Sequence, residues 1–182
     1  FVWLERAVTA GLVQPSQYTS DPDLAAVRAD PRFAGLMQRV QATFAPCESD
    51  PDARRFDFWV GEWDVSPSGA PTVAAGRSSV QRVSGGCALL ENWTASNGSV
   101  GKSLNAFNKA TGQWQQYWVG QGGGVVEFRE SRWDGPTLVL RTVGGTPWQR
   151  LSFTPIDSNT VRQFGETSSD SGKTWQVGYD FR

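Results

Sequence analysis

The fold of this chain is decided between residues 87 and 120, which read CALLENWTASNGSVGKSLNAFNKATGQWQQYWVG. Three runs that contain aromatic and β-branched residues are separated there by the turn pairs Asn97-Gly98 and Thr111-Gly112. Links this short join only antiparallel neighbours, because a parallel pair needs a crossover of a dozen or more residues. The stretch therefore predicts three consecutive strands of an antiparallel meander.

The same pattern of short runs and glycine-containing turns continues on both sides of this stretch. A long meander would leave two exposed strand edges unless it closed on itself, so we expect an up-and-down barrel. The fold class is therefore mainly β, a barrel of about ten antiparallel strands with a short N-terminal α-helical segment. The expected strands are 58–66, 73–83, 87–95, 100–109, 113–120, 124–132, 137–143, 147–154, 160–168 and 174–181.

The first part of the chain has a different composition and period. Residues 1–45 hold two of the 20 glycines and one of the nine tryptophans, and their apolar residues recur at helical spacing. Two Asp-Pro pairs mark helix starts, since aspartate caps a helix and proline suits its first position. We predict a helical segment at 1–45, a proline-punctuated linker at 46–55 and a barrel domain at 56–182.

The helical segment carries apolar stripes that so few residues are not expected to bury alone. We therefore expect the helices to dock on the barrel or to pair two copies of the chain as a homodimer. The chain begins at Phe1 rather than Met, from which we expect a processed or truncated product. The stripes consist of Phe1, Leu4, Val8, Phe33, Leu36, Met37 and Val40.

Composition excludes several classes of function. The chain contains no histidine, which rules out a His-ligated haem, most zinc sites and a Ser-His-Asp triad. Its 17 basic and 18 acidic residues give a net charge of −1, so we expect no nucleic-acid partner. No apolar run approaches the length of a transmembrane helix, so we expect no membrane span.

Several strings resemble one protein group. Residues 56–65 read FDFWVGEWDV, and their Gly61-x-Trp63 element resembles the signature of calycins, which include lipocalins and nitrobindin-like barrels. With GGCALLENW, WQQYWV and ETSSDSGKTW in order, the chain is similar to bacterial lipocalin-like proteins of the DUF1579 type. The strings WLERAVTAG and DPDLAAVRADPRF resemble the closing helices of a tetratricopeptide-like repeat.

The resemblance implies a barrel but no settled activity. It implies structural roles for Gly61 and Trp63, with the indole closing one barrel end beneath the cation of Arg162 or Arg182. The haem-binding relatives use a proximal histidine, which this chain lacks, so we expect no cofactor and no metal.

The two cysteines, Cys47 and Cys87, are 40 residues apart and form no CxxC motif. From the residues alone they are either unrelated buried thiols or a disulfide pair. The family resemblance adds weight to a disulfide. A disulfide would indicate an oxidising compartment, and we therefore expect a periplasmic or secreted protein.

Strand alternation indicates which side chains face the lumen. In the last strand Trp175, Val177, Tyr179 and Phe181 share the face expected inside. In the strands at 87–109 either of the two alternating faces can be the one that lines the lumen. Arg162 and Glu166 fit either the lumen or a solvated face. The candidate ligand-binding residues are Glu91, Trp93, Ser103, Asn105, Gln116, Trp118, Arg162, Glu166 and Tyr179.

Three functions fit these features. The first is a binding or carrier barrel for a small, mostly apolar or aromatic ligand, which the many tryptophans favour. The second is a non-catalytic interaction module attached to a helical-repeat protein, which a solid lumen would favour. The third is a small acid/base isomerase or cyclase that uses Glu91 or Glu166, with burial raising the pKa of the carboxyl.

Overall fold

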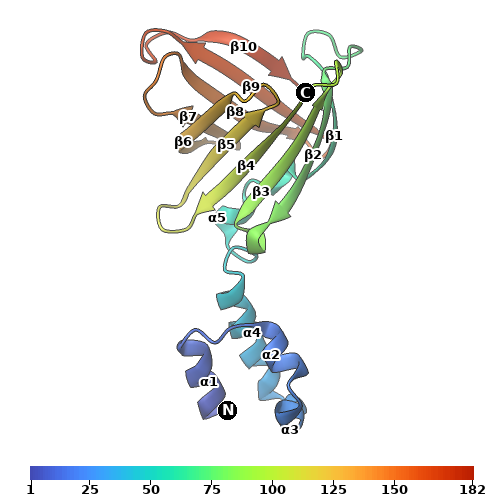
Figure 1. Cartoon of the computed structure of the whole chain (residues 1–182), viewed down its shortest axis with the longest axis vertical. Coiled ribbons are helices and arrows are strands. Elements are labelled where there is room, and N and C mark those ends of the chain that lie inside the picture. The colour runs from blue at the N-terminus through green and yellow to red at the C-terminus, as the bar shows by residue number, and fades with distance from the viewer.

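The computed structural model describes all 182 residues, and its ten strands form one antiparallel sheet in sequence order. The sheet curls into a nearly closed barrel (Figure 1). The predicted mainly-β, up-and-down fold is confirmed, with strand ends shifted by a few residues. The strands are β1 (Gly61–Val65), β2 (Gly76–Val83), β3 (Ala88–Ala95), β4 (Val100–Asn108), β5 (Gln113–Gly120), β6 (Val125–Asp134), β7 (Thr137–Thr142), β8 (Trp148–Asp157), β9 (Thr160–Ser168) and β10 (Gln176–Phe181).

The barrel closes through the segment that follows β1. The Ser66 N–H donates to the Arg182 carbonyl at 2.8 Å, and the Arg182 N–H donates back at 2.9 Å. The Ser68 N–H donates to the Asp180 carbonyl at 2.9 Å, and its hydroxyl donates to the Asp180 carboxylate at 2.7 Å. These bonds satisfy part of the two edges that an open meander would leave unpaired.

The N-terminal residues form four helices, α1 (Val2–Thr9), α2 (Pro15–Ser20), α3 (Ala25–Arg28) and α4 (Arg32–Phe44). They pack against one another below the barrel, where α1 and α2 both contact α4 (Figure 1). None of the helices has the length and apolar character that a membrane-spanning helix needs.

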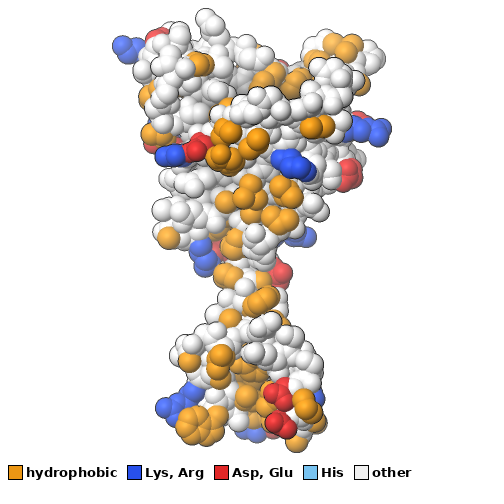
Figure 2. All heavy atoms as spheres, in the orientation of Figure 1, with side chains coloured by type: hydrophobic (Ala, Val, Ile, Leu, Met, Phe, Trp, Pro, Cys, Tyr) orange, Lys and Arg blue, Asp and Glu red, His pale blue; other side chains and the backbone are white.

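The helical stripes find their partner within the segment itself. Val8, Tyr18, Leu36 and Val40 are buried together and form a small core separate from that of the barrel. The expected docking of this stripe on the barrel is therefore wrong, because α1 and α2 already cover it by packing against α4. Figure 2 shows the narrow waist that joins the helical unit to the barrel.

The chain plugs one end of the barrel before it enters the sheet. Residues 57–59 form a 3-10 turn rather than the expected start of a strand. Phe56 is fully buried, with its ring centroid 5.0 Å from that of Phe153 and 5.2 Å from that of Trp114. Trp59 lies 4.5 Å from Phe153, so this half of the lumen is a packed aromatic core.

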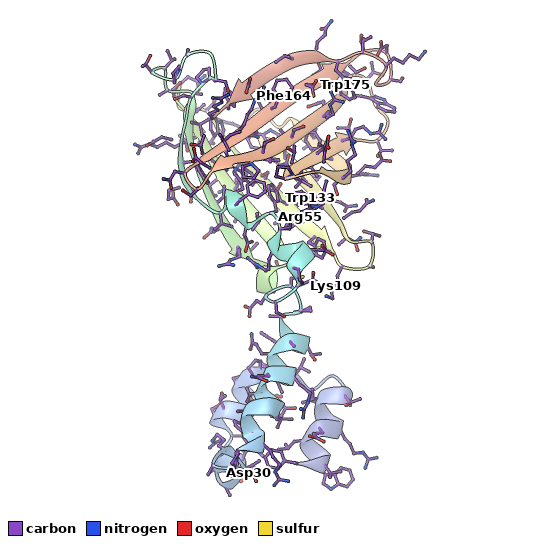
Figure 3. The ribbon with its side chains drawn as sticks, turned by 180° about the vertical axis from the view of Figure 1, so that it is seen from behind. Asp30, Arg55, Lys109, Trp133, Phe164 and Trp175 are labelled. Atoms are coloured by element: carbon purple, nitrogen blue, oxygen red, sulfur yellow. A yellow bond between two sulfur atoms is a disulfide. The ribbon has the colours of Figure 1, made fainter.

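Three further contacts hold the plug in place. Cys47 and Cys87 form a disulfide with their Cα atoms 5.0 Å apart, which ties the incoming chain to the start of β3. Asp50 caps the short helix α5 (Pro51–Arg54) and pairs with Lys109. Arg55 lies over the Trp133 ring at 4.0 Å, and Figure 3 shows both near the lower end of the barrel.

Candidate functional site

The other half of the lumen contains a cavity of about 360 Å³. It opens away from the plug, since its walls come from the strand halves distant from Cys87. Its volume lies at the small end of the range of natural ligand pockets, about 300–1,000 Å³. The lining residues are Glu91, Trp93, Gln116, Trp118, Val126, Phe128, Gln149, Leu151, Gln163, Tyr179 and Phe181.

The aromatic walls of the cavity depend on glycines in the neighbouring strands. A Cβ atom added at Gly101 would stand 2.4 Å from the Trp118 ring, because the indole lies directly against this backbone. The Trp93 ring lies in the same way against Gly76, where a Cβ would stand 2.7 Å away. The Tyr179 ring covers Gly165, where an added Cβ would stand 2.3 Å from the ring. Each ring therefore lies along the barrel wall and leaves the middle of the lumen open.

A buried carboxyl forms the polar end of the cavity. Glu91 on β3 is only 4% exposed, and its two oxygens accept hydrogen bonds from Ser78 and Ser103, both at 2.8 Å. The Asn105 amide donates to the Ser103 hydroxyl at 2.9 Å, and the Gln116 amide donates to Asn105 at 2.7 Å. The network fixes the orientation of the carboxyl from behind, while one side of Glu91 faces the cavity.

Electrostatics make this carboxyl unusual. Burial raises the pKa of Glu91, and the hydrogen bonds from Ser103 and Ser78 act in the opposite direction with smaller effect. Burial also raises the pKa of Tyr179, and the nearby Glu91 charge adds to that rise. The lining residues include no lysine or arginine, so Glu91 is a buried acid without a cationic partner in the cavity.

Most of the candidate residues are brought together at this cavity. Glu91, Trp93, Gln116, Trp118 and Tyr179 line it, which settles the open parity of β3 in favour of the lumen. The remaining two polar candidates on β4, Ser103 and Asn105, are buried behind the lining in the network of Glu91.

Two candidates lie outside the barrel. Arg162 pairs with Asp180 at 2.7 Å, and Glu166 pairs with Arg150 at 2.7 Å. Of the two alternatives left open for Arg162 and Glu166, the structure shows the outer face, which removes both from the candidate ligand-binding residues. On β9 it is Gln163, between them, that faces the cavity.

The alternate residues of β10 do not all face the lumen. Its register against β9 shifts between Val177, which lies opposite Glu166, and Tyr179, which lies opposite Gly165. This bulge reverses the alternation, so Tyr179 and Phe181 line the cavity while Val177 is 63% exposed. Trp175 lies outside, beneath Arg150 at 4.3 Å. The expectation of four inward residues on this strand is therefore wrong for Val177 and Trp175.

Gly61 and Trp63 belong to the packed half of the barrel. The Trp63 indole N–H donates to the Trp59 carbonyl at 2.9 Å, and Gly61 has a φ of +151°, which favours glycine. Arg162 stacks on Phe164 at 4.5 Å rather than on Trp63. Sequence reasoning missed Phe56 and Trp59 as the buried plug, although the dense aromatic string FDFW was the available signal.

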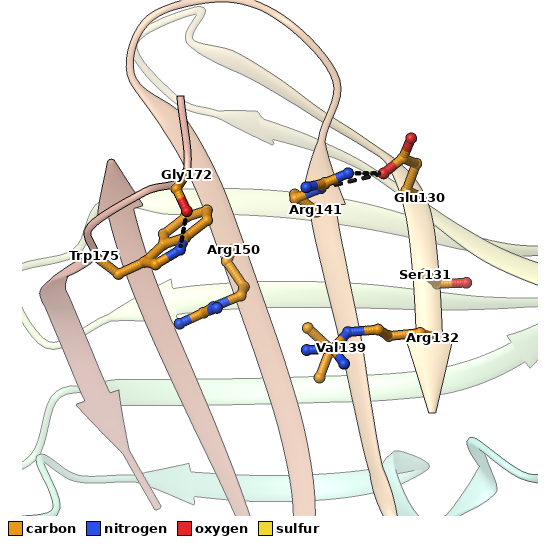
Figure 4. A pocket seen from close by; sticks show the side chains of 8 residues that line it. All are labelled: Glu130, Ser131, Arg132, Val139, Arg141, Arg150, Gly172 and Trp175. Atoms are coloured by element: carbon orange, nitrogen blue, oxygen red, sulfur yellow. Dashed lines mark hydrogen bonds and ion pairs between the residues drawn. The ribbon is translucent and has the colours of Figure 1, made fainter. Parts of the chain in front are cut away.

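A second hollow, of about 330 Å³, lies on the outer wall over β6, β7 and β8 (Figure 4). Arg141 on its rim pairs with Glu130. Arg150 pairs with Glu166 and stacks on Trp175. A third arginine, Arg132, also lines the hollow and has no carboxylate partner, so only Arg141 and Arg150 are already paired there.

No known protein-family description matches this chain, and no curated protein is significantly similar to it. No group of three or more His, Cys, Asp or Glu side chains gathers in the structure as metal ligands would. The chemistry of the lumen site is that of one carboxyl, neutral amides, hydroxyls and aromatic rings. A barrel with buried aromatic residues and such a cavity is compatible with ligand binding.

Proposed function

We propose that this protein binds a small, mostly apolar or aromatic molecule in the open half of its barrel. The observation that carries the proposal is the cavity walled by Trp93, Trp118, Tyr179 and Phe181 and ended by the Glu91 network. Apolar walls with a few fixed polar groups are the usual composition of a small-molecule site.

The division of the lumen supports binding over a purely structural role. The barrel gains its stability in the half filled by Phe56, Trp59, Trp114 and Phe153. The other half keeps large rings against its wall, and the three glycines beneath them provide the space. A module selected only for stability or surface contact has no need for an open, aromatic cavity of this kind.

The ten-stranded antiparallel barrel supports our proposal that the chain is related to calycin barrels of the lipocalin type. The disulfide between Cys47 and Cys87 supports a periplasmic or secreted location, where such bonds persist. The four N-terminal helices fit the proposed attachment to a helical-repeat array.

The test combines native mass spectrometry with a pair of matched glycine variants. Native spectra of the purified protein are expected to show a bound small molecule. When an aromatic probe binds to protein stripped of that molecule, the tryptophan fluorescence is expected to fall, because Trp93 and Trp118 line the cavity. Gly101→Ala should displace the Trp118 ring into the cavity and weaken probe binding about tenfold or more, or about 1.4 kcal/mol.

Gly120→Ala is the control, since Gly120 lies opposite Gly101 in register. Its added Cβ would stand 3.6 Å from the indole nitrogen of Trp118, which is an ordinary van der Waals contact. Binding should survive there within about twofold. Equal binding by wild type, Gly101→Ala and Gly120→Ala, or no adduct and no quenching, would overturn the proposal.

A further inference from the structure

The polar end of the cavity is a buried carboxyl, Glu91, that has no basic partner. Charged groups that are almost wholly buried are normally paired, because desolvation of an isolated charge is costly. Glu91 receives two hydroxyl hydrogen bonds, an arrangement that suits a carboxylate, and yet no basic side chain lines the cavity. Arg150 on β8 and Arg162 on β9, two other strands that line the cavity, carry their cations on the outer face in pairs with other carboxylates.

The walls have the complementary property. Trp93, Trp118, Tyr179 and Phe181 surround the space in front of Glu91. The faces of such rings carry negative electrostatic potential and attract cations, tryptophan most strongly. Walls and floor of the cavity therefore favour positive charge.

We propose that the cavity binds a monovalent organic cation, an aromatic or alicyclic amine, whose ammonium group pairs with Glu91 while its apolar part lies between Trp93 and Trp118. This inference rests on the proposed binding function and names the class of ligand. The ligand supplies the one buried cation that the protein itself lacks.

Neutral amides complete the ammonium site. Gln116 uses its amide N–H group on Asn105, which leaves its carbonyl oxygen as an acceptor at the cavity. Gln149 and Gln163 bring two more uncharged amides to the same lining. An ammonium group offers three donors, which one carboxylate and nearby amide oxygens can accept.

Anionic amphiphiles are disfavoured by the same arrangement. A carboxylate ligand would meet Glu91 with no arginine or lysine in the lining to offset the repulsion. With a neutral ligand in the cavity, Glu91 is neutralised by a proton and forms no ion pair. A neutral ligand is therefore expected to bind more weakly than a cation of equal shape.

Binding of the cation is coupled to a proton. Burial favours the protonated form of Glu91 in the empty cavity, so the acid releases its proton to solvent as the ammonium group arrives. Ser78 and Ser103 face the carboxyl from β2 and β4, and Tyr179 on β10 is the other ionisable group of the lining. Affinity for an amine is therefore expected to fall as pH falls, while affinity for a neutral analogue stays level.

The test uses three probes that share a phenyl group on a short chain: 2-phenylethylamine, 2-phenylethanol and 3-phenylpropionate. Dissociation constants are measured by tryptophan quenching and calorimetry at pH 7. We expect the amine to bind at least about tenfold more tightly than the alcohol, and the acid to bind most weakly.

Two variants with the same Glu-to-Gln substitution separate the effect of the cavity carboxyl from that of a carboxyl elsewhere on the protein. Glu91→Gln should weaken the amine about tenfold or more and leave the alcohol within about twofold, which also shows that the variant is folded. Glu62→Gln makes the same substitution on the exposed outer face of β1 and should leave all three dissociation constants unchanged.

The charge proposal is overturned if the alcohol binds wild type as tightly as the amine, or if Glu91→Gln keeps full amine affinity. In either case retained alcohol binding leaves the proposed function standing. Failure of all three probes, together with an empty cavity in native spectra, would overturn both.

Discussion

Replacement of Glu91 by glutamine tests the electrostatic account of the cavity without any ligand. Glutamine has nearly the same shape, and its amide can still exchange hydrogen bonds with Ser78 and Ser103. The variant removes only the ability to ionise. Any difference between the two proteins that depends on pH therefore reports the buried carboxyl.

The sign of the effect follows from the raised pKa of Glu91 in the folded protein. Between the ordinary carboxyl value and the raised value, the folded chain holds a proton that the unfolded chain has lost, so stability falls as pH rises. The fall relative to Glu91→Gln approaches about 1.4 kcal/mol per pH unit in that window and stops above the folded-state pKa. Below the ordinary carboxyl value the two proteins keep a constant difference.

Urea denaturation from pH 4 to pH 8, with the disulfide intact, measures this difference directly. The midpoint of the wild type should decrease with pH relative to that of Glu91→Gln, at equal m-values. Glu62→Gln provides the control, since it makes the same substitution at an exposed position on β1. A difference that stays flat from pH 4 to pH 8, or one that rises with pH, would refute the raised pKa and with it the desolvated floor of the cavity.

Three further outcomes concern the plug, the disulfide and the helices. Phe56→Ala should lower the free energy of unfolding by about 3–5 kcal/mol because the ring is fully buried among four other aromatic residues. Val177→Ala beside the exposed bulge should change it by less than about 0.5 kcal/mol in the same urea titration. Free-thiol titration of unreduced protein should find no thiol, and replacing both Cys47 and Cys87 by serine should cost about 4 kcal/mol from the entropy of a 40-residue loop; two titratable thiols would contradict the bond. Because the helices have their own small core, amides of α4 should exchange faster than those of β8 and β9 and lose protection at lower urea, and loss of protection at one common midpoint would show that the two parts unfold together.

Much of the fold was accessible from the sequence because its signals are local. A glycine turn such as Asn97-Gly98 and the alternation of the run that follows it lie within a few residues of each other. Short links then leave antiparallel neighbours as the one available pairing, and closure follows from the cost of free edges. The same alternation placed Trp118 and Gln116 on one face, which the structure shows to be the lumen.

The candidate site was only partly accessible, since it depends on contacts between distant strands. The bulge in β10 between Val177 and Tyr179 is set by pairing with β9, so alternation along β10 alone could not locate the reversal. That one-residue shift put Trp175 outside the barrel.

What the sequence by itself determined is the series of ten strands, their meander and the aromatic character of the barrel. Only the tertiary structure decided that Glu91 is buried without a cation, that the Trp118 ring lies on Gly101, and that Phe56 fills one end of the lumen and leaves the other open. The physical reason is that strand formation follows from each segment's own pattern, whereas burial, charge pairing and cavity shape are properties of side chains that meet only when the sheet has closed.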